Sequence, residues 1–321
     1  MRQLLILLLF AGFLSAKSQS IVDQHGQLHV DGNYVMDEHN KPVQLRGMSL
    51  FWSQWQGKYY TPGVVKWLKK DWGCTVVRAA MGVEKGGYLK DPKAEQAKAE
   101  TVIKACIKND IYVIIDYHAH EAHENTQAAK TFFAEMAQKY GDKPNVIYEI
   151  YNEPLGGAAH WSENIKPYAQ QVIDTIRHYD PDNIIIVGTP QWSQLVDAAA
   201  ADPIEKPNIA YTLHFYATTH RQELRDIAQI ALDKGLCLVV TEFGTCPASG
   251  DGKLDFEETL RWFEFLDKYK ISWCNWSIAD KEESASAVVN GANEWGGWKM
   301  EELTESGRFI RNQIRTGNGV K

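Results

Sequence analysis

Three glutamates stand out in the sequence because each lies in or beside a run of apolar, β-branched residues. Glu149 and Glu153 belong to the segment VIYEIYNEPLGG, and Glu242 belongs to VVTEFG. Burying a carboxylate is costly unless it is paired or hydrogen-bonded, so each of them needs a structural or chemical reason. Two carboxylates that face one cleft can hydrolyse a glycosidic bond, one as a protonated acid and the other as an ionised nucleophile. Arg78 supplies a cation that could keep one of them ionised.

The elements that would position these side chains follow a regular rhythm along the chain. Apolar runs with the composition of buried strands predict strands at residues 43–47, 75–80, 112–116, 146–151, 183–188, 209–214, 237–242 and 271–276. Helical periodicity between these runs predicts helices at residues 63–72, 94–108, 125–140, 163–178, 193–199, 221–234, 256–270 and 302–314. Buried strands that alternate with amphipathic helices are typical of a parallel sheet in the α/β class.

Eight strand–helix units in one chain favour a closed (β/α)8 TIM barrel. An open doubly wound sheet is the alternative, but it would usually carry a glycine-rich phosphate loop after its first strand, and this sequence has none. No linker interrupts the series, so residues 19–321 are interpreted as a single catalytic domain. The segments DGN and DEHNKP are typical of turns and predict a short N-terminal β-hairpin that caps the base of the barrel.

The carboxyl ends of the predicted strands are polar or aromatic, whereas each run just upstream is apolar. The residues at these ends are Arg78, His118, Asn152, Glu153, His214, Tyr216, Glu242 and Trp276. Active sites of such barrels lie at this end, so Glu153 and Glu242 are expected to face one cavity. Strict alternation would send Asn152 and Glu153 to opposite faces, so the strand must bend there, and Pro154 fits such a break. Glu149 lies deeper and is expected to be a structural carboxylate paired inside the barrel.

The first 18 residues have the layout of a secretory signal peptide. Arg2 precedes an apolar run that extends from Leu4 to Leu14, and small residues follow. The run is shorter than the ~20 residues that span a bilayer; an uncleaved membrane anchor is the alternative. We therefore expect a secreted or periplasmic protein. The net charge of −7 at pH 7 makes nucleic acid and anionic membranes unfavourable partners.

The cysteines are five in number and contain no close pair: Cys74, Cys106, Cys237, Cys246 and Cys274. Several of them lie in or beside strand-like runs, where a small buried apolar side chain fits. One disulfide is an open alternative, because secreted proteins can form them.

Several short segments together resemble one enzyme family. VIYEIYNEPL resembles the signature of glycoside hydrolase family five, and LRGMS, VVRAAM, DYH, HFYA, TEFG and WSI recur in the same order and at similar spacing. The resemblance covers residues 26–314, nearly the whole expected mature chain. It looks closest to the bacterial endo-β-1,4-glucanase (cellulase) branch, because GTPQWSQ and DKEESAS are similar to segments of that branch.

The resemblance implies a role for each matching position. Glu153 matches the general acid/base and Glu242 the nucleophile, which implies a retaining mechanism through a covalent glycosyl-enzyme intermediate. We expect burial and nearby negative charge to keep Glu153 protonated. The other matches hold the nucleophile or bind the β-1,4-glucan substrate: Arg78, Tyr216, His118, His214, Asn152 at the sugar 2-hydroxyl, Trp276 under the sugar, and Trp55, Trp192, Lys281 and Glu283 at flanking sugar sites. Relatives carry a His shortly after GMS; this chain has LFWSQW, so Phe51 or Trp52 would take its place.

Two other functions fit part of the sequence. His118, His120 and His123 follow one strand and could be metal ligands, but their spacing is not His-Glu-x-x-His, and the predicted strand that ends in VGTP offers no ligand. We therefore expect no metal and no cofactor, with His120 and His123 as ordinary loop residues. A non-catalytic carbohydrate-binding barrel would keep the tryptophans, which can stack on sugars, but would not need both carboxylates and the arginine.

Alternative substrates and an alternative structural role also remain open if the protein is a carbohydrate-active enzyme. β-Mannan, xylan and xyloglucan are alternative substrates, since related barrels share the same carboxylates. Any single carboxylate could instead form an ion pair that seals the barrel, an interpretation that weakens when several strands end together in polar and aromatic groups. We expect the protein to act as a monomer.

Overall fold

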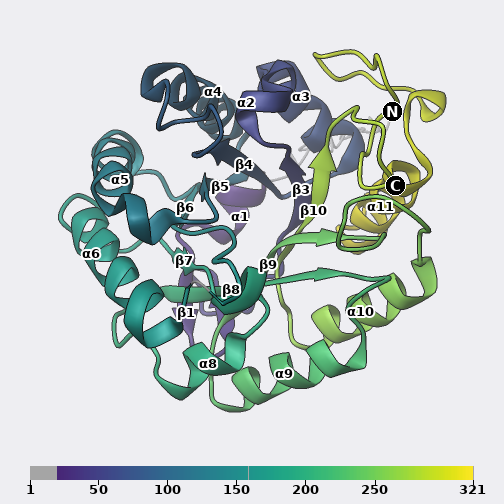
Figure 1. The fold of residues 1–321 in the computed structure, drawn as a ribbon. Helices are drawn as coiled ribbons and strands as arrows, with labels where there is room; N and C mark the ends of the chain where they lie inside the picture. Colours follow the sequence, from purple (N-terminus) through teal and green to yellow (C-terminus); the bar gives the residue numbers. More distant parts are fainter. Residues whose placement is uncertain (1–19, 158, 321) are drawn as a thin grey trace, which may run out of the picture.

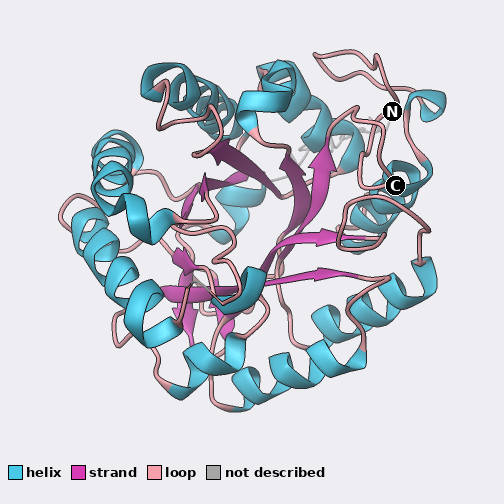
Figure 2. Cartoon of the chain, viewed as in Figure 1, coloured by secondary structure: helices cyan, strands magenta, loops and turns pink. Residues whose placement is uncertain are grey.

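In the computed structural model, which describes residues 20–157 and 159–320, eight parallel strands close into a barrel with helices around it (Figure 1, Figure 2). The strands pair around the ring in the order β10-β3-β4-β5-β6-β7-β8-β9. Their bounds are β3 (Arg46–Leu50), β4 (Val76–Gly82), β5 (Tyr112–His118), β6 (Val146–Glu149), β7 (Ile185–Val187), β8 (Ile209–Tyr216), β9 (Leu238–Gly244) and β10 (Trp273–Ile278). Each overlaps a predicted strand, so the closed barrel is confirmed and the open-sheet alternative is wrong.

Helices surround the ring of strands (Figure 2). The longer ones are α3 (Pro62–Trp67), α4 (Pro92–Asn109), α5 (Thr126–Tyr140), α6 (Lys166–Arg177), α8 (Val196–Ala201), α9 (Gln222–Asp233), α10 (Phe256–Lys268) and α11 (Glu305–Gly317). Shorter segments are α1 (Ile21–His25), α2 (Ser53–Gln56), α7 (Pro190–Ser193), the 3-10 turns Gly57–Tyr59, Ala122–Asn125 and Met300–Glu302, and the π turns Leu68–Trp72 and Trp161–Ile165. Each predicted helix overlaps one of the longer helices, whereas α1, α2 and α7 are too short to show a periodic pattern.

The interior of the barrel is layered, because inward-facing residues recur at every second position along a strand. Near the amino-terminal ends, one apolar cluster includes four residues that come from four different strands: Val76, Ile114, Ile147 and Val239. Two positions further along the same strands lie fully buried polar side chains: Arg78, Asp116, Glu149 and Thr241. The barrel therefore has an apolar base, a charged middle layer, and a mouth at the carboxyl ends of the strands.

A short hairpin and a helix cover the base of the barrel. β1 (His29–Asp31) pairs antiparallel with β2 (Tyr34–Met36). Gly32 in the intervening turn has a φ of 55°, a left-handed conformation that glycine adopts without steric cost. Val35 of the hairpin and Val22 of α1 pack into the apolar cluster at the base. The hairpin predicted from the DGN turn is present in the predicted place.

The predicted signal peptide, residues 1–18, lies outside the described residues. Within the part of the chain that the structure describes, no helix combines the length and the apolar content needed to cross a membrane.

All five cysteines are free and buried, so none of them forms the disulfide that the sequence left open. Burial raises the pKa of the Cys74 and Cys274 thiols, which keeps them in the unreactive thiol form. We expect the native protein to resist a thiol reagent such as dithiobis(nitrobenzoate). The guanidinium-unfolded protein should titrate as five thiols without any reductant. A count that rises only after reduction would contradict the structure.

Candidate active site

Arg78 is the centre of the charged layer, and its guanidinium is fully buried. Nε and Nη2 donate to the two oxygens of Glu149 at 2.7 and 3.0 Å, in a bidentate pairing. Nη1 donates to Oε2 of Glu242 at 3.1 Å, and Nη2 donates to Oδ1 of Asn152 at 2.6 Å. The partner of Glu149, which the sequence could not name, is therefore Arg78. The same guanidinium joins β4 to β6, to β9 and to the loop after β6.

Asp116 brings a third carboxylate to Arg78, with Oδ2 2.9 Å from Nη2. Burial raises the pKa of Asp116 to about 7; Arg78 opposes this effect and the charge of Glu242 reinforces it. Oδ2 of Asp116 also lies 2.6 Å from Nδ1 of His118. Burial and the charge of Arg78 hold the pKa of His118 well below its usual value, so this imidazole is neutral. Asp116 was not predicted as a site residue. Its place two positions after Ile114, on the inward face of the same strand, is the sequence feature that could have indicated it.

Glu242 is held at the mouth of the barrel by two donors. Arg78 donates to Oε2, as described, and the hydroxyl of Tyr216 donates to Oε1 at 2.7 Å. The side chain of Glu242 is only 6% exposed. The two donors fix the orientation of the carboxylate, and both oxygens act as hydrogen-bond acceptors.

A β-bulge in β9 turns both Thr241 and Glu242 toward the interior. Thr212 of β8 pairs with Val239, whereas His214 pairs with Glu242, so the register shifts by one residue between the two pairs. Without this shift, Thr241 and Glu242 would point to opposite faces of the strand. Bulges re-aim side chains in this way next to functional sites.

The chain bends directly after β6, as expected from Pro154. Asn152 and Glu153 lie in the loop that follows the strand. The N–H of Glu153 donates to the carbonyl oxygen of Ala119 at 3.2 Å. Oγ of Ser193 donates to the carbonyl oxygen of Asn152 at 2.7 Å. These bonds fix a loop conformation in which Asn152 contacts the charged layer and Glu153 lines the mouth.

Two histidines contact the carboxylate of Glu153. Nδ1 of His214 lies 2.9 Å from Oε1, and Nε2 of His120 lies 3.5 Å from Oε2. Burial alone would raise the pKa of Glu153, but the hydrogen bonds and charges of His120 and His214 lower it to about 2. The expectation that Glu153 stays protonated in the free protein is therefore wrong. Burial lowers the pKa of His120, but the hydrogen bond and charge of Glu153 outweigh this effect and raise it.

His120 lies in the loop after β5, as expected, but this loop places it in the site, where it contacts Glu153 and lines the cleft described below. Only the folded conformation of the loop after β5 brings it there. His123, in contrast, places Nδ1 2.8 Å from the hydroxyl of Tyr151.

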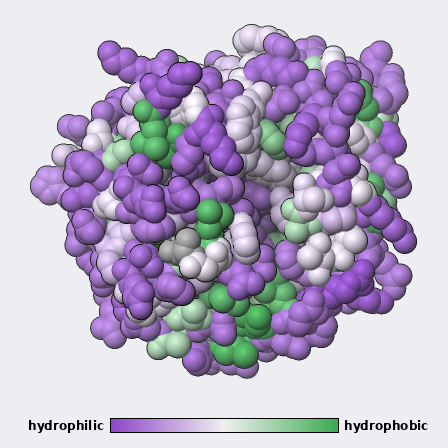
Figure 3. Space-filling model, viewed as in Figure 1, coloured by the Kyte–Doolittle hydropathy of each residue, from purple (hydrophilic) through white to green (hydrophobic). Residues whose placement is uncertain are grey.

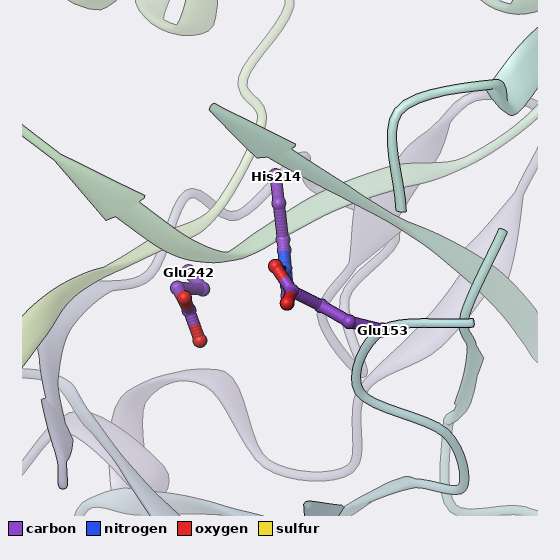
Figure 4. Close-up of side chains that lie close together, drawn as sticks. All are labelled: Glu153, His214 and Glu242. Atoms are coloured by element: carbon purple, nitrogen blue, oxygen red, sulfur yellow. Dashed lines mark hydrogen bonds and ion pairs between the residues drawn. The ribbon is translucent and has the colours of Figure 1, made fainter. Parts of the chain in front are cut away.

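Glu153, His214 and Glu242 lie close together at the mouth (Figure 4). One potential ligand atom from each lies within 4.8 Å of the others, and within the described residues this is the one such group of potential metal ligands. Both ring nitrogens of His214 already have partners, Glu153 at Nδ1 and Thr241 at Nε2. A metal ion would have to displace these contacts. The histidine cluster of the metal alternative, His118, His120 and His123, does not form a group of this kind in the described part of the chain.

Two depressions meet at the carboxylates and form one cleft across a face that is hollowed near its middle (Figure 3). The first, of about 380 Å³, contains Trp192 and His214. The second, of about 330 Å³, contains the remaining predicted residues of the cleft: Trp55, His118, Asn152, Trp276, Lys281 and Glu283. Glu153, Tyr216 and Glu242 line both. Every predicted site residue therefore lines the cleft except Arg78, which lies beneath it.

Aromatic side chains form much of the second depression. The ring of Trp276 stacks on His118, with centroids 5.1 Å apart and planes 5° from parallel. Phe51 packs against Trp276 at 5.0 Å, and Trp52 meets the ring of His118 edge-on at 4.2 Å. Phe51 and Trp52 thus both occupy the region where relatives were expected to carry a histidine. Trp55 is 50% exposed, which leaves an indole face open to a ligand.

Trp192, on the other side of the carboxylates, is 41% exposed and stands on a strained turn. Gln191, Trp192 and Ser193 have φ angles of 55°, 55° and 57°, and a left-handed conformation costs roughly 1–2 kcal/mol at each non-glycine residue. The N–H of Trp192 donates to the carbonyl oxygen of Pro154 at 2.9 Å. The turn that presents Trp192 therefore also braces the loop that carries Glu153. Such strain is typical of functional sites.

A known family matches most of the chain. The model of the family described as Cellulase (glycosyl hydrolase family 5) matches residues 36–282. The chain belongs to glycosyl hydrolase family 5. The resemblance seen in the sequence motifs is thereby confirmed, and the matched segment contains every predicted site residue of this family 5 protein except Glu283.

Named relatives of this family 5 chain are longer than it is. It is 51% identical over 293 residues to Endoglucanase Z of Dickeya dadantii (strain 3937), covering 90% of this chain and 66% of the relative. It is 46% identical over 317 residues to Endoglucanase A of Evansella cellulosilytica, covering 98% of this chain and 65% of the relative. The chain thus spans about two thirds of the length of these relatives.

Among solved structures, the chain is similar to the catalytic domain of the Thermobifida fusca endoglucanase Cel5A, a variant of which is in complex with cellotetraose. The two are 36% identical with a TM-score of 0.87, and the match covers 92% of this chain and 99% of that chain.

The lowered pKa of Glu153 makes a testable contribution to stability. Because this pKa falls from 4.5 to about 2 on folding, the stabilisation is complete above pH 4.5 and is lost as the pH falls toward 2. We expect the free energy of unfolding to fall less steeply over this interval in Glu153→Gln than in the wild type, measured by urea unfolding at a series of pH values. Glu264→Gln, at an exposed position of α10, is the control and should keep the wild-type slope. Equal slopes for Glu153→Gln and the wild type would show that the histidines do not hold this carboxylate.

Proposed function

We propose that the protein is a retaining endo-β-1,4-glucanase, a cellulase that hydrolyses internal β-1,4-glucosidic bonds. The observation that carries the proposal is the pair Glu153 and Glu242, with one carboxylate oxygen of each within 4.8 Å, in the middle of the cleft. Carboxyl groups about 5–5.5 Å apart leave no room for water between the nucleophile and the anomeric carbon. Glu242 is therefore positioned to attack the sugar directly.

The form of the cleft supports cleavage within a chain. The cleft extends from the carboxylates toward Trp192 in one direction and toward Trp55 and Trp276 in the other. Indole faces stack on the apolar faces of sugars, and polar groups such as Lys281 at the edge can bind hydroxyls. Sugar units can then bind on both sides of the cleaved bond, as an internal bond requires.

The relatives support β-1,4-glucan as the substrate. Two of them are named Endoglucanase Z and Endoglucanase A, and the similar Thermobifida fusca catalytic domain binds cellotetraose. β-Mannan, xylan and xyloglucan are the alternatives that the same carboxylates could serve.

The chemistry follows from the contacts of each residue. Glu242 attacks the anomeric carbon while Glu153 gives a proton to the leaving oxygen, drawn from the proton held among Glu153 and its histidines. Water then attacks the anomeric carbon of the glycosyl-enzyme, Glu153 takes a proton from this water, and the bond from the anomeric carbon to Glu242 breaks. Because Oδ1 of Asn152 accepts from Arg78, its amide NH₂ is the group available to donate to the sugar 2-hydroxyl.

Export of the protein is part of the same proposal. A charged start, a short apolar run and small residues support residues 1–18 as a signal peptide that is removed on secretion. The mature chain would then act in the periplasm or outside the cell, where polysaccharide is available. We propose separately that it acts as a monomer.

Activity on a panel of polysaccharides tests the proposal. Among carboxymethylcellulose, mixed-linkage β-glucan, mannan, xylan and xyloglucan, we expect the fastest release of reducing ends from carboxymethylcellulose and mixed-linkage β-glucan. Glu242→Gln should lower kcat by on the order of 10⁴-fold, since the amide cannot form the glycosyl ester. The exposed control Glu264→Gln should retain wild-type activity. Preference for mannan, xylan or xyloglucan would overturn the assignment of β-1,4-glucan as the substrate. Activity in a folded Glu242→Gln variant would overturn the assignment of Glu242 as the nucleophile.

The stereochemistry of the first product tests the mechanism independently. Two successive inversions at the anomeric carbon should release a β-configured product from a β-1,4-linked oligosaccharide, as seen by NMR before mutarotation. An α-anomer appearing first would mean a single inversion by water, and would remove the assigned role of Glu242.

A further inference from the structure

Thr241 lies beneath the cleft, between the charged layer and His214. Its Oγ donates to Oε1 of Glu149 at 2.7 Å, and Nε2 of His214 lies 2.8 Å from the same hydroxyl oxygen. The hydroxyl of Thr212 contacts it from the neighbouring strand. Thr241 is fully buried and is not among the residues that line the cleft. Any effect of this hydroxyl on a bound substrate must therefore pass through another residue.

The direction of these hydrogen bonds follows from their partners. Arg78 can only donate, and it donates to both oxygens of Glu149. Burial raises the pKa of Glu149, and the charge of Arg78 opposes this effect. The two oxygens of Glu149 face three hydrogen-bond partners, namely Nε and Nη2 of Arg78 and the hydroxyl of Thr241, and toward all three the carboxylate acts as the acceptor. Glu149 therefore receives the one hydroxyl hydrogen of Thr241. Toward His214 the hydroxyl can then only accept, which requires a hydrogen on Nε2.

We propose that Thr241 is a positioning residue that fixes the hydrogen of His214 on Nε2, so that Nδ1 is the atom that exchanges a proton with Glu153. Nδ1 lies 2.9 Å from Oε1 of Glu153. The inference rests on the proposed function, in which Glu153 is the acid, and it adds the residue that determines how this acid keeps its proton.

The fixed hydrogen on Nε2 has a consequence for pH dependence. With that position filled, Nδ1 and Glu153 share one proton, carried either by the carboxyl group or by the ring. Loss of that proton leaves a carboxylate facing a bare ring nitrogen, and neither can donate to the other. The pair therefore keeps its proton to a higher pH than it would if the ring could carry its hydrogen on Nδ1 alone.

Titratable and charged groups from the surrounding elements also act on this pair. They are Arg78, Asp116, His120, Glu149, Tyr216, His220 and Glu242. Valine at position 241 or at position 212 leaves all of them in place, so a comparison of the two variants isolates the hydroxyl of Thr241.

The pH profile of kcat/KM on a soluble β-1,4-glucan tests the proposal. Thr241→Val keeps the shape of the side chain but leaves Nε2 without an acceptor, so neutral His214 can place its hydrogen on Nδ1 and donate to ionised Glu153. We expect the basic limb of the profile, the fall of kcat/KM at high pH, to move about one pH unit lower. A shift of this size corresponds to the loss of one buried hydrogen bond. Thr241→Ser should restore the wild-type limb. Thr212→Val, the matched control, should keep it.

Two results would overturn the proposal. One is an unchanged basic limb in a folded Thr241→Val variant. The other is a loss of activity that is uniform across pH, because that is the signature of a merely structural role. Urea unfolding of each variant establishes that it is folded.

A second measurement needs neither a folded Thr241→Val variant nor activity. ¹⁵N NMR of the imidazole nitrogens of wild-type protein, with His214 assigned by difference from His214→Asn, reports which nitrogen carries the hydrogen above the basic limb. A hydrogen on Nε2 supports the proposal, and a hydrogen on Nδ1 overturns it. Failure of the proposed glucanase function would appear differently, as no hydrolysis of any glucan by the wild type.

Discussion

A guanidinium buried beneath the mouth of a barrel is stable only if opposite charge surrounds it. The carboxylates that surround Arg78 determine the organisation of this site. Arg78 meets Glu149, Asp116 and Glu242, which come from three different strands. Removing one partner of a buried pair of this kind typically costs about 3–5 kcal/mol, because the other charge is left unpaired. Three carboxylates for one cation leave an excess of negative charge. Burial raises the pKa of Asp116 to about 7, and the negative charge of Glu242 reinforces this effect against the opposing charge of Arg78.

The same arrangement gives the two carboxylates at the mouth different surroundings. Glu242 accepts from a guanidinium and a phenol that are both buried, whereas Glu153 meets two imidazoles that can carry or release a proton. Paired titratable groups whose environments differ in this way divide acid and nucleophile roles between them. The apolar base of the barrel, the charged layer above it and the cleft at the top are successive inward positions on the same strands. The fold therefore determines the chemistry as well as the positions of the residues.

The strand ends could be predicted from the sequence because two signals coincide there. Apolar runs mark the strands, and polar or aromatic residues such as His118 and Glu242 end them, so the barrel rule locates the site without any distance information. The bend at Asn152 and Glu153 was also predictable, since Pro154 cannot continue a strand ladder. These features depend on local sequence alone.

The features that could not be predicted depend on tertiary contacts. Thr241 precedes Glu242 directly, and only the register shift between β8 and β9 brings both inward. Asp116 lies inside an apolar run, so its role emerges only when Arg78 is placed beside it. The protonation of Glu153 was predicted wrongly because the sequence shows its burial but not the approach of His120 from a separate loop. Each of these features needs a contact between segments that lie apart in the sequence.

In the proposed mechanism Glu242, oriented by Arg78 and Tyr216, forms a covalent bond to the sugar. Mass spectrometry after reaction with a 2-deoxy-2-fluoro cellobioside carrying a good leaving group tests it most directly, because the fluorine slows hydrolysis of the glycosyl-enzyme. We expect one added glycosyl group per chain, located on the peptide that contains Glu242. An adduct on Glu153, or release of the leaving group with no adduct at any time, would contradict it.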